Sequence, residues 1–119
     1  MKILKTNIDN LAESAMLVYK LTKSKLAKSV NKMTDTELDN DYPVDAYLFY
    51  EDTNNKGEAI ILLSILSGDT VIVAQSQTFR ASFEDITEIC GDRPFTIQVV
   101  TGTSKSGRRY MDCELKAIG

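Results

Sequence analysis

The apolar residues of this chain follow a two-residue period over most of residues 42–116 and switch once to a helical period. After the switch, apolar side chains recur at the spacing of one helix face, at Phe79, Phe83, Ile86 and Cys90. Alternating segments are typical of strands, so a single helix interrupts a series of strands. This order restricts the main part of the chain to a small group of mostly-β folds.

Three segments before the predicted helix have the composition and alternation of strands. The first has Val44, Ala46, Leu48 and Tyr50 on one face and Asp45, Tyr47, Phe49 and Glu51 on the other. The second is apolar on both faces, so we expect both faces to be buried. The segments and their connecting loops are Tyr42–Glu51, Asp52–Gly57, Glu58–Leu66, Ser67–Asp69 and Thr70–Gln75.

The helix has clear boundary signals. Thr78 is a candidate N-cap, and Ser82 with Asp85 offers an alternative capping box one turn later. Gly91 stands where a helix commonly ends in a left-handed residue. Two strands joined by a turn then follow, at Phe95–Thr103, Ser104–Gly107 and Arg108–Lys116.

The resulting order, β-β-β-α-β-β, is that of the OB-fold, a five-stranded Greek-key barrel. An SH3-like barrel lacks so long a helix at this place, and a ferredoxin-like fold needs a helix directly after the first strand. We therefore predict an all-β domain with one helix. With 119 residues, we expect a single domain over residues 1–119, with the barrel at 42–117 and an N-terminal extension and acidic loop at 1–41.

The N-terminal extension allows two interpretations. Asp9 or Asn10 could cap a helix, whereas Ala15–Leu21 also alternates well enough for a strand. We favour an added strand followed by a basic loop at Lys20–Lys32, and a polar loop at Thr34–Asp41. The apolar residues of this extension are available to cover the second apolar face of Glu58–Leu66.

Charge is unevenly distributed. The chain has 14 Lys and Arg against 17 Asp and Glu, so its net charge of −3 excludes a uniformly basic wrap around nucleic acid. Residues 1–33 carry seven Lys against two acidic residues, residues 34–92 carry thirteen acidic against two basic residues, and residues 93–119 carry five basic against two acidic residues. Either these are ordinary solvated faces, or the two basic ends converge on one anionic ligand.

The sequence gives no sign of a membrane segment or an enzyme. Its longest apolar run, Ala59–Leu63, is far shorter than the ~20 residues of a membrane helix, and its start has no apolar signal region, so we expect a cytoplasmic protein. Histidine, the commonest general base and metal ligand, is absent. We expect no catalysis, cofactor or small-molecule substrate.

Two remaining chemical possibilities have simpler explanations. The acidic residues that a metal site would need lie in a predicted loop or on the polar face of the predicted helix, so we expect no metal site. Cys90 and Cys113 have no metal-binding spacing, and both fall on predicted core faces, so we expect two free, buried thiols.

Basic and aromatic residues gather in the last hairpin. Lys105 and Arg108 flank a glycine turn, and Tyr110 follows two residues later. Lys56 lies in the first hairpin loop, and Tyr47 and Phe49 lie on the more polar face of the first strand. Single-stranded nucleic acid requires cations for its phosphates and rings for its bases, and OB-folds bind it with these loops. We therefore predict six contact residues, with core packing or a subunit contact as the alternative for the two β-strand aromatics: Tyr47, Phe49, Lys56, Lys105, Arg108 and Tyr110.

Four segments also resemble a known family. They are similar to single-stranded-DNA-binding proteins of tailed phages of Gram-positive bacteria, including the small phages that use protein-primed replication, and they are Leu48–Gly57 (LFYEDTNNKG), Leu62–Leu66, Thr78–Ile86 (TFRASFEDI) and Thr101–Tyr110 (TGTSKSGRRY) with the following Met111–Leu115. The resemblance covers about residues 42–117. It implies a protein that coats displaced single strands during phage DNA replication in the host cytoplasm, and DNA contacts by Lys105, Arg108 and Tyr110.

We therefore expect a protein that binds and protects single-stranded DNA with little sequence preference. The alternative is a protein-interaction or inhibitor module of similar fold that uses its acidic middle segment. The two differ in charge placement, because a DNA coat should bring both basic ends to one face. A mimic of nucleic acid should instead present one continuous acidic surface. Self-association stays open, since the extension has two candidate roles, adding to the barrel or joining neighbouring subunits.

Overall fold

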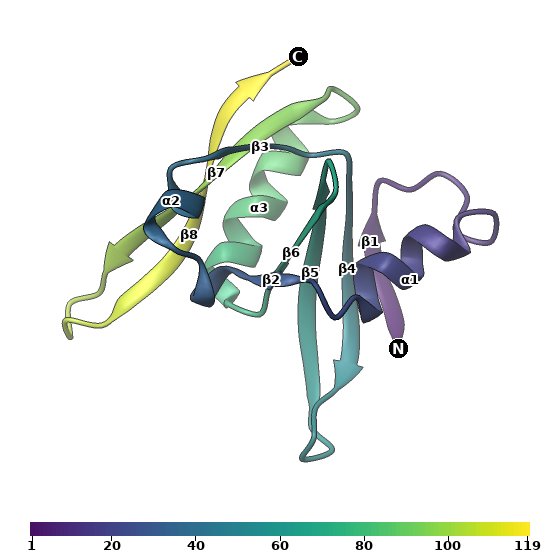
Figure 1. Cartoon of the computed structure of the whole chain (residues 1–119), viewed down its shortest axis with the longest axis horizontal. Coiled ribbons are helices and arrows are strands. Elements are labelled where there is room, and N and C mark those ends of the chain that lie inside the picture. Colours follow the sequence, from purple (N-terminus) through teal and green to yellow (C-terminus); the bar gives the residue numbers. More distant parts are fainter.

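The computed structural model describes residues 1–119 and contains two β-sheets, one long helix and several short helical segments. Hydrogen bonds order the five-stranded sheet as β1-β4-β5-β6-β2 and the three-stranded sheet as β3-β7-β8 (Figure 1). The elements are β1 (Lys2–Thr6), α1 (Ala15–Lys23), β2 (Lys28–Ser29), a 3-10 turn (Val30–Lys32), α2 (Asp35–Leu38), β3 (Asp41–Pro43), β4 (Ala46–Thr53), β5 (Ala59–Ser67), β6 (Thr70–Ala74), α3 (Gln77–Cys90), β7 (Phe95–Thr103) and β8 (Arg109–Ile118).

The predicted first strand is bent and belongs to both sheets. Its first part, β3, pairs with β7, and its second part, β4, pairs with β5. The bend consists of Val44, whose amide donates to the Phe95 carbonyl at 2.9 Å, and Asp45, whose amide donates to the Leu66 carbonyl at 2.8 Å. The two sheets are therefore continuous through one chain segment, and the order β-β-β-α-β-β holds from β3/β4 to β8.

The hydrogen-bonded ladder does not close into a complete barrel. Strand β6 pairs with β5 and with the two-residue β2, whereas β8 pairs only with β7. The 3-10 turn lies against both β6 and β8, and its Val30 side chain is completely buried. The N-terminal extension thus fills the opening between the two sheets with packed side chains instead of backbone hydrogen bonds.

Three predictions for the extension are wrong. The segment Lys20–Lys32 is not a loop but contains the end of α1, β2 and the 3-10 turn, because β2 pairs with β6 and Val30 is buried. Ala15–Leu21 is helical instead of extended, because Leu17, Val18 and Leu21 pack together against the sheet on one helix face. The segment Thr34–Asp41 is not a simple loop but contains α2, and the domain therefore has more than the single helix that we predicted.

Helix α2 begins with a reciprocal capping box. The Thr34 hydroxyl accepts from the Glu37 amide at 3.3 Å, and the Glu37 carboxylate accepts from the Thr34 amide at 2.9 Å. This backbone hydrogen bond, more than the nearby Lys28, lowers the pKa of Glu37. The motif T-x-x-E is a recognised signal for a helix start, and it was present in the sequence.

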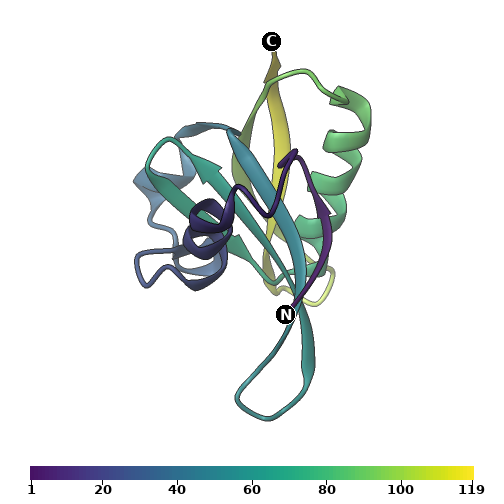
Figure 2. The same cartoon turned by 90° about the vertical axis from the view of Figure 1, so that its right-hand side faces the viewer.

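The extension does cover the second face of β5, as predicted. Helix α1 and α3 lie on opposite sides of the strands (Figure 2). A second apolar cluster under α1 contains Leu21, Leu48 and Tyr50, with Leu62 and Leu66 of β5 packed against it. The main core lies on the other side, between the two sheets and α3.

Helix α3 matches its predicted stripe. Phe79, Phe83, Ile86 and Cys90 are all buried in the main core. The N-cap is Ser76 instead of Thr78 or Ser82, since the Ser76 hydroxyl accepts from the Phe79 amide at 3.3 Å. At the other end, the C-cap Gly91 has a φ of 58° and a ψ of −124°, so it has the positive φ that favours glycine but not the left-handed helical conformation that we predicted.

Both cysteines are free and buried, as predicted. Burial, followed by the nearby carboxylates of Asp112 and Glu114, raises the pKa of Cys113 to about 12. No helix of the structure combines the length and apolar character needed to cross a membrane.

Candidate nucleic-acid interface

The structure removes Tyr47 and Phe49 from the predicted interface. Their exposed fractions are 8% and 4%, and both rings belong to the main core. Tyr47 packs edge-to-face on Phe83 with ring centroids 5.3 Å apart, and on Phe49 with centroids 6.1 Å apart. Burial also raises the pKa of the Tyr47 hydroxyl. The core alternative is therefore the correct one, because neither ring is accessible to a base.

The β7–β8 turn is closed by its own backbone hydrogen bonds. The Ser104 amide donates to the Arg108 carbonyl at 2.8 Å, and the Gly107 amide donates to the Ser104 carbonyl at 2.9 Å. Gly107 has a φ of 83°, a conformation that a side chain would disfavour. Lys105 and Arg108 are exposed on this turn, and neither forms a salt bridge. The turn therefore presents two uncompensated cations on a defined backbone.

Tyr110 lies directly beyond this turn, on the side of the hairpin that faces solvent. Its exposed fraction is 39%, and its cross-strand partner in the ladder is Gly102. The end of the ring occupies the space above Gly102, so that a Cβ at position 102 would lie 2.5 Å from the Tyr110 hydroxyl oxygen. Because Gly102 on β7 has no side chain, the Tyr110 ring on β8 lies over it, and part of this ring is exposed to a ligand.

Lys56 lies at the tip of the β4–β5 hairpin. The Asn54 side-chain oxygen accepts from the amides of Lys56 and Glu58 at 2.9 and 3.0 Å, which fixes the loop. The β4–β5 and β7–β8 hairpins are two separate arms that extend toward the same end of the molecule (Figures 1 and 2). The structure therefore brings Lys56 to the same end as Lys105 and Arg108, though on a different arm.

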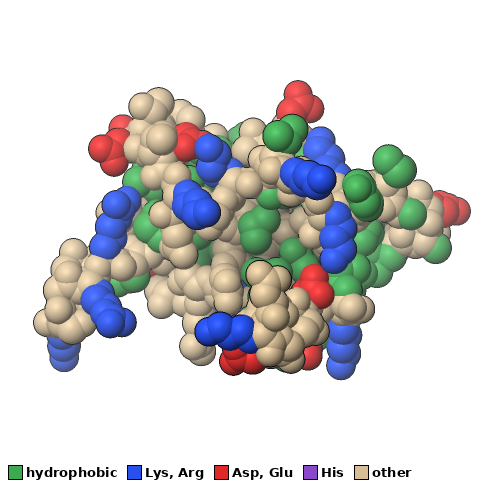
Figure 3. Space-filling view, turned by 60° about the horizontal axis from the view of Figure 1, so that its bottom comes forward, with side chains coloured by type: hydrophobic (Ala, Val, Ile, Leu, Met, Phe, Trp, Pro, Cys, Tyr) green, Lys and Arg blue, Asp and Glu red, His purple; other side chains and the backbone are tan.

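Basic side chains from both ends of the chain share one face. Figure 3 shows this face, with Lys and Arg distributed from the β7–β8 arm across to the N-terminal elements and Asp and Glu mostly at its margin. Residues 14–34 contain five Lys and neither Asp nor Glu. This placement is the one expected of a protein that binds a polyanion across several elements.

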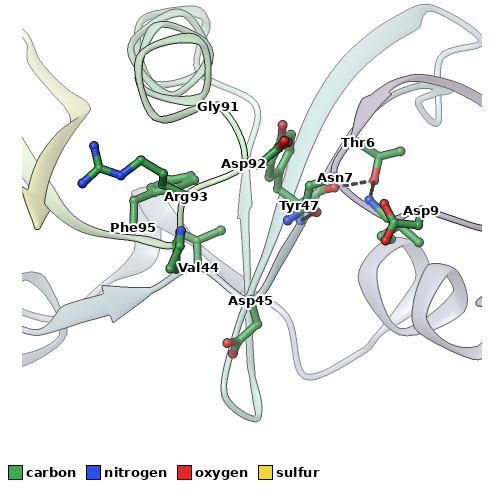
Figure 4. A pocket seen from close by; sticks show the side chains of 12 residues that line it. Thr6, Asn7, Asp9, Val44, Asp45, Tyr47, Gly91, Asp92, Arg93 and Phe95 are labelled. Atoms are coloured by element: carbon green, nitrogen blue, oxygen red, sulfur yellow. Dashed lines mark hydrogen bonds between the residues drawn. The ribbon is translucent and has the colours of Figure 1, made fainter. Parts of the chain in front are cut away.

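The largest cleft lies at the opposite end and is unsuited to an anion. It encloses about 740 Å³ between the loop after β1, the bend before β4 and the loop after α3. Figure 4 shows Asp9, Asp45 and Asp92 around this cleft, together with Arg93.

Several groups of this cleft already have structural roles. The Asp45 carboxylate accepts from the Gly68 amide at 2.7 Å, and the Asn7 side-chain oxygen accepts from the Tyr47 amide at 2.9 Å. Arg93 donates through its Nε to the Gly119 carbonyl at 3.2 Å. Across the molecule, no three His, Cys, Asp or Glu residues are grouped so that they could hold a metal ion.

Comparison with known proteins identifies no relative, so the candidate interface is assigned from the residues described above. No family model, curated protein or solved structure matches the chain. The candidate interface is therefore defined by its own geometry, that is, Lys105, Arg108 and Tyr110 on one arm and Lys56 on the other.

Sequence reasoning missed the role of Gly102. Counting outward from the Ser104–Arg108 turn pairs Thr103 with Arg109 and then Gly102 with Tyr110, which is the observed register. A glycine opposite an aromatic residue at the end of a hairpin was thus a readable signal that the ring has a seat on the neighbouring strand.

Proposed function

We propose that this chain binds single-stranded DNA with little sequence preference, without catalysis or a cofactor, through the β7–β8 hairpin. The observation that carries the proposal is the partly exposed Tyr110 ring, seated on Gly102 beside the unpaired Lys105 and Arg108. A ring and cations in this arrangement can stack a base while neutralising phosphates, and neither contact depends on base identity.

The topology supports a matching fold. We propose that β3/β4, β5, β6, α3, β7 and β8 form a variant OB-fold in which the N-terminal extension occupies the gap between β6 and β8. The shared strand β3/β4 is the feature expected of the first strand of such a barrel, since it pairs with both sheets. In this fold the β4–β5 and β7–β8 loops flank the oligonucleotide, which agrees with their basic tips.

The resemblance to phage single-stranded-DNA-binding proteins supports the same function, because one of its segments, Thr101–Tyr110, contains the ring, the glycine beneath it and the cations. Protection of displaced strands during phage-type replication follows as the proposed role. The alternative, a nucleic-acid mimic, needs one continuous acidic surface. The acidic residues lie on α2, the β4–β5 arm, the outer side of α3 and the cleft of Figure 4, which are separate places.

Fluorescence anisotropy with labelled oligothymidine, a duplex of equal length and oligouridine, at two salt concentrations, tests the function. We expect tighter binding of the single strand than of the duplex. Since each neutralised phosphate of a single strand contributes a slope of about −0.7 in log affinity against log salt, Lys56, Lys105 and Arg108 together predict about −2. Equal affinity for single strand and duplex, or binding of neither, would contradict the proposal, and the oligouridine arm determines the preference between DNA and RNA.

A further inference from the structure

The outer side of α1 carries large apolar and aromatic side chains that are exposed to solvent. Tyr19 is 62% exposed, Met16 is 80% exposed, and Leu26 in the loop after the helix is 92% exposed. Together with Leu17 and nearby lysines, these residues line a shallow hollow of about 580 Å³. Single exposed apolar residues are ordinary, but a ring and two long apolar side chains around one hollow indicate a binding surface.

All charged residues that line this hollow are lysines. The acid-free segment 14–34 places Lys20, Lys23 and Lys25 at the hollow. Lys23 is paired with Asp52 at 3.4 Å, whereas Lys20 and Lys25 have no acidic partner. An exposed tyrosine between free lysines repeats the combination found at the β7–β8 hairpin, in which a ring and cations occur together.

The position of α1 over the sheet connects this surface with the proposed function. In an OB-fold, the outer face of the second and third strands contacts the oligonucleotide, and in the proposed fold these strands are β5 and β6. Here that face is covered, since Leu62 and Leu66 of β5 and Val71 and Val73 of β6 belong to the cluster under α1. A strand of nucleic acid that extends from the hairpin arms across this region therefore meets the outer side of α1 instead of the sheet.

We propose that the α1 patch, defined as Met16, Tyr19, Lys20, Lys25 and Leu26, is a second contact surface for the same single strand of nucleic acid. The Tyr19 ring stacks a base, Lys20 and Lys25 contact phosphates, and the apolar side chains border the stacked base. This inference rests on the function proposed above. Figure 3 agrees with it, because apolar and basic side chains over α1 lie on the same face as the basic hairpin arms.

Oligonucleotide length separates the two surfaces. The longest dimension of the molecule is 44 Å, and single OB-folds bind about 4–16 nucleotides. An oligothymidine of about 6 nucleotides can occupy the hairpin alone, whereas one of about 16 can extend to α1. Anisotropy titrations of both lengths at low salt, with sedimentation velocity on the same samples, therefore test the proposal.

We expect Tyr19→Ala to weaken binding of the longer oligonucleotide by about five- to 150-fold and to leave the shorter one unchanged. Lys20→Gln combined with Lys25→Gln should lower the salt slope for the longer oligonucleotide by about 1.4, and it tests the same surface without altering the ring. The matched control is Ile89→Ala, which removes an apolar side chain that is 72% exposed on α3, on the other side of the sheet.

Three results overturn the proposal in distinguishable ways. If the wild-type protein binds neither length, the proposed function itself fails. If it binds both and each α1 variant binds the longer oligonucleotide as tightly as wild type, only the α1 surface fails. If Tyr19→Ala changes the sedimentation coefficient of the free protein but not the affinity per protomer, the patch joins copies of the chain, with the acidic outer side of α3 as a candidate complement.

Discussion

Strands β4 and β8 both contain aromatic residues, but the rings of β4 are buried whereas the ring of β8 is partly exposed. In β4, Tyr47 and Phe49 face the main core, and Tyr50 on the other face is buried in the cluster under α1. In β8, Met111 and Cys113 face the core, and Tyr110 on the other face stays 39% exposed. Strand β4 lies between β1 and β5 and is covered on both sides, whereas β8 is an edge strand whose outward face is largely exposed.

The difference shows that alternation assigns residues to faces but does not determine which faces are covered. Coverage depends on elements that are distant in sequence, here α1 over β4 and α3 over β8. We therefore assign a role in stability to the β4 rings and a role in binding to the β8 ring, and the following substitutions test this division of roles.

The largest effect should come from Phe49→Ala. Phe49 is 4% exposed and lies 6.0 Å from Phe83 between ring centroids. Truncating a buried phenylalanine leaves a cavity and typically costs about 3–5 kcal/mol of unfolding free energy. Urea unfolding measures this loss, with Tyr110→Ala as the matched aromatic control that should lose far less. A fully stable Phe49→Ala protein with impaired binding would reverse the division of roles.

The next largest effect concerns thiol labelling of Cys113 on the core-facing side of β8. Because the pKa of Cys113 is raised from 9.0 to about 12, its thiolate fraction at pH 8 is about a thousandfold below that of a free cysteine. In a Cys90→Ala background we expect labelling by a thiol reagent to be far slower than that of a free cysteine, because Cys113 is also buried, and to become rapid in urea. Rapid labelling of the native protein would mean that β8 is not covered on its inner side.

Tyr110→Ala should act on binding instead of folding. Loss of one stacked base costs about 1–3 kcal/mol of binding free energy, and the salt slope should hardly change because no charge is removed. Anisotropy at several salt concentrations measures both quantities, and thermal unfolding checks the fold. Strong destabilisation by this change would show that the ring belongs to the core, and unchanged affinity in a well-folded variant would show that it contacts no base.

Gly102→Ala examines the seat of the same ring. A Cβ at this position would overlap the end of the Tyr110 ring, while the backbone itself has no positive φ that would require glycine. We expect a displaced ring and a loss of affinity no larger than that of Tyr110→Ala. In the double variant the two losses should not add, since both act through one ring. Additive losses would mean that Gly102 acts independently of Tyr110.

The smallest effect should come from single cations. Lys105→Ala removes one phosphate contact, so it should lower the salt slope by about 0.7 and weaken binding to a similar degree for all sequences. Lys116→Ala is the matched control, because Lys116 lies on β8 far from the turn and carries the same charge. Equal effects of the two substitutions would indicate a general charge effect instead of a contact at the hairpin.

The local parts of the fold could be predicted from sequence, and the long-range parts could not. The helix stripe Phe79–Cys90 and the strand Phe95–Thr103 follow from the spacing of apolar residues and from the glycine and proline residues that border these elements. Both are as predicted. The burial of Tyr47 and Phe49 could not be deduced, since their face is polar at its ends and its cover comes from α3. The strand predicted at Ala15–Leu21 was wrong because its apolar residues satisfy both periods, and packing under the helix decides between them.

The candidate site divides in the same way. The turn residues Lys105, Arg108 and Tyr110 were identified from composition around Gly107 alone, and the structure leaves all of them exposed. Tyr19 was not identified, because its exposure depends on α1 being a helix with Leu17, Val18 and Leu21 turned inward.

Photo-crosslinking tests the division between the two strands most directly. An oligothymidine in which single thymines are replaced by 5-iodouracil is bound to the protein and irradiated, and mass spectrometry identifies the aromatic residues joined to it. We predict a crosslink at Tyr110 and none at Tyr47 or Phe49. The Tyr110 crosslink should be lost when an excess of unlabelled single strand competes and retained when duplex competes. Crosslinks at Tyr47 or Phe49 in the folded protein, or none at Tyr110 in a complex that forms, would contradict this prediction.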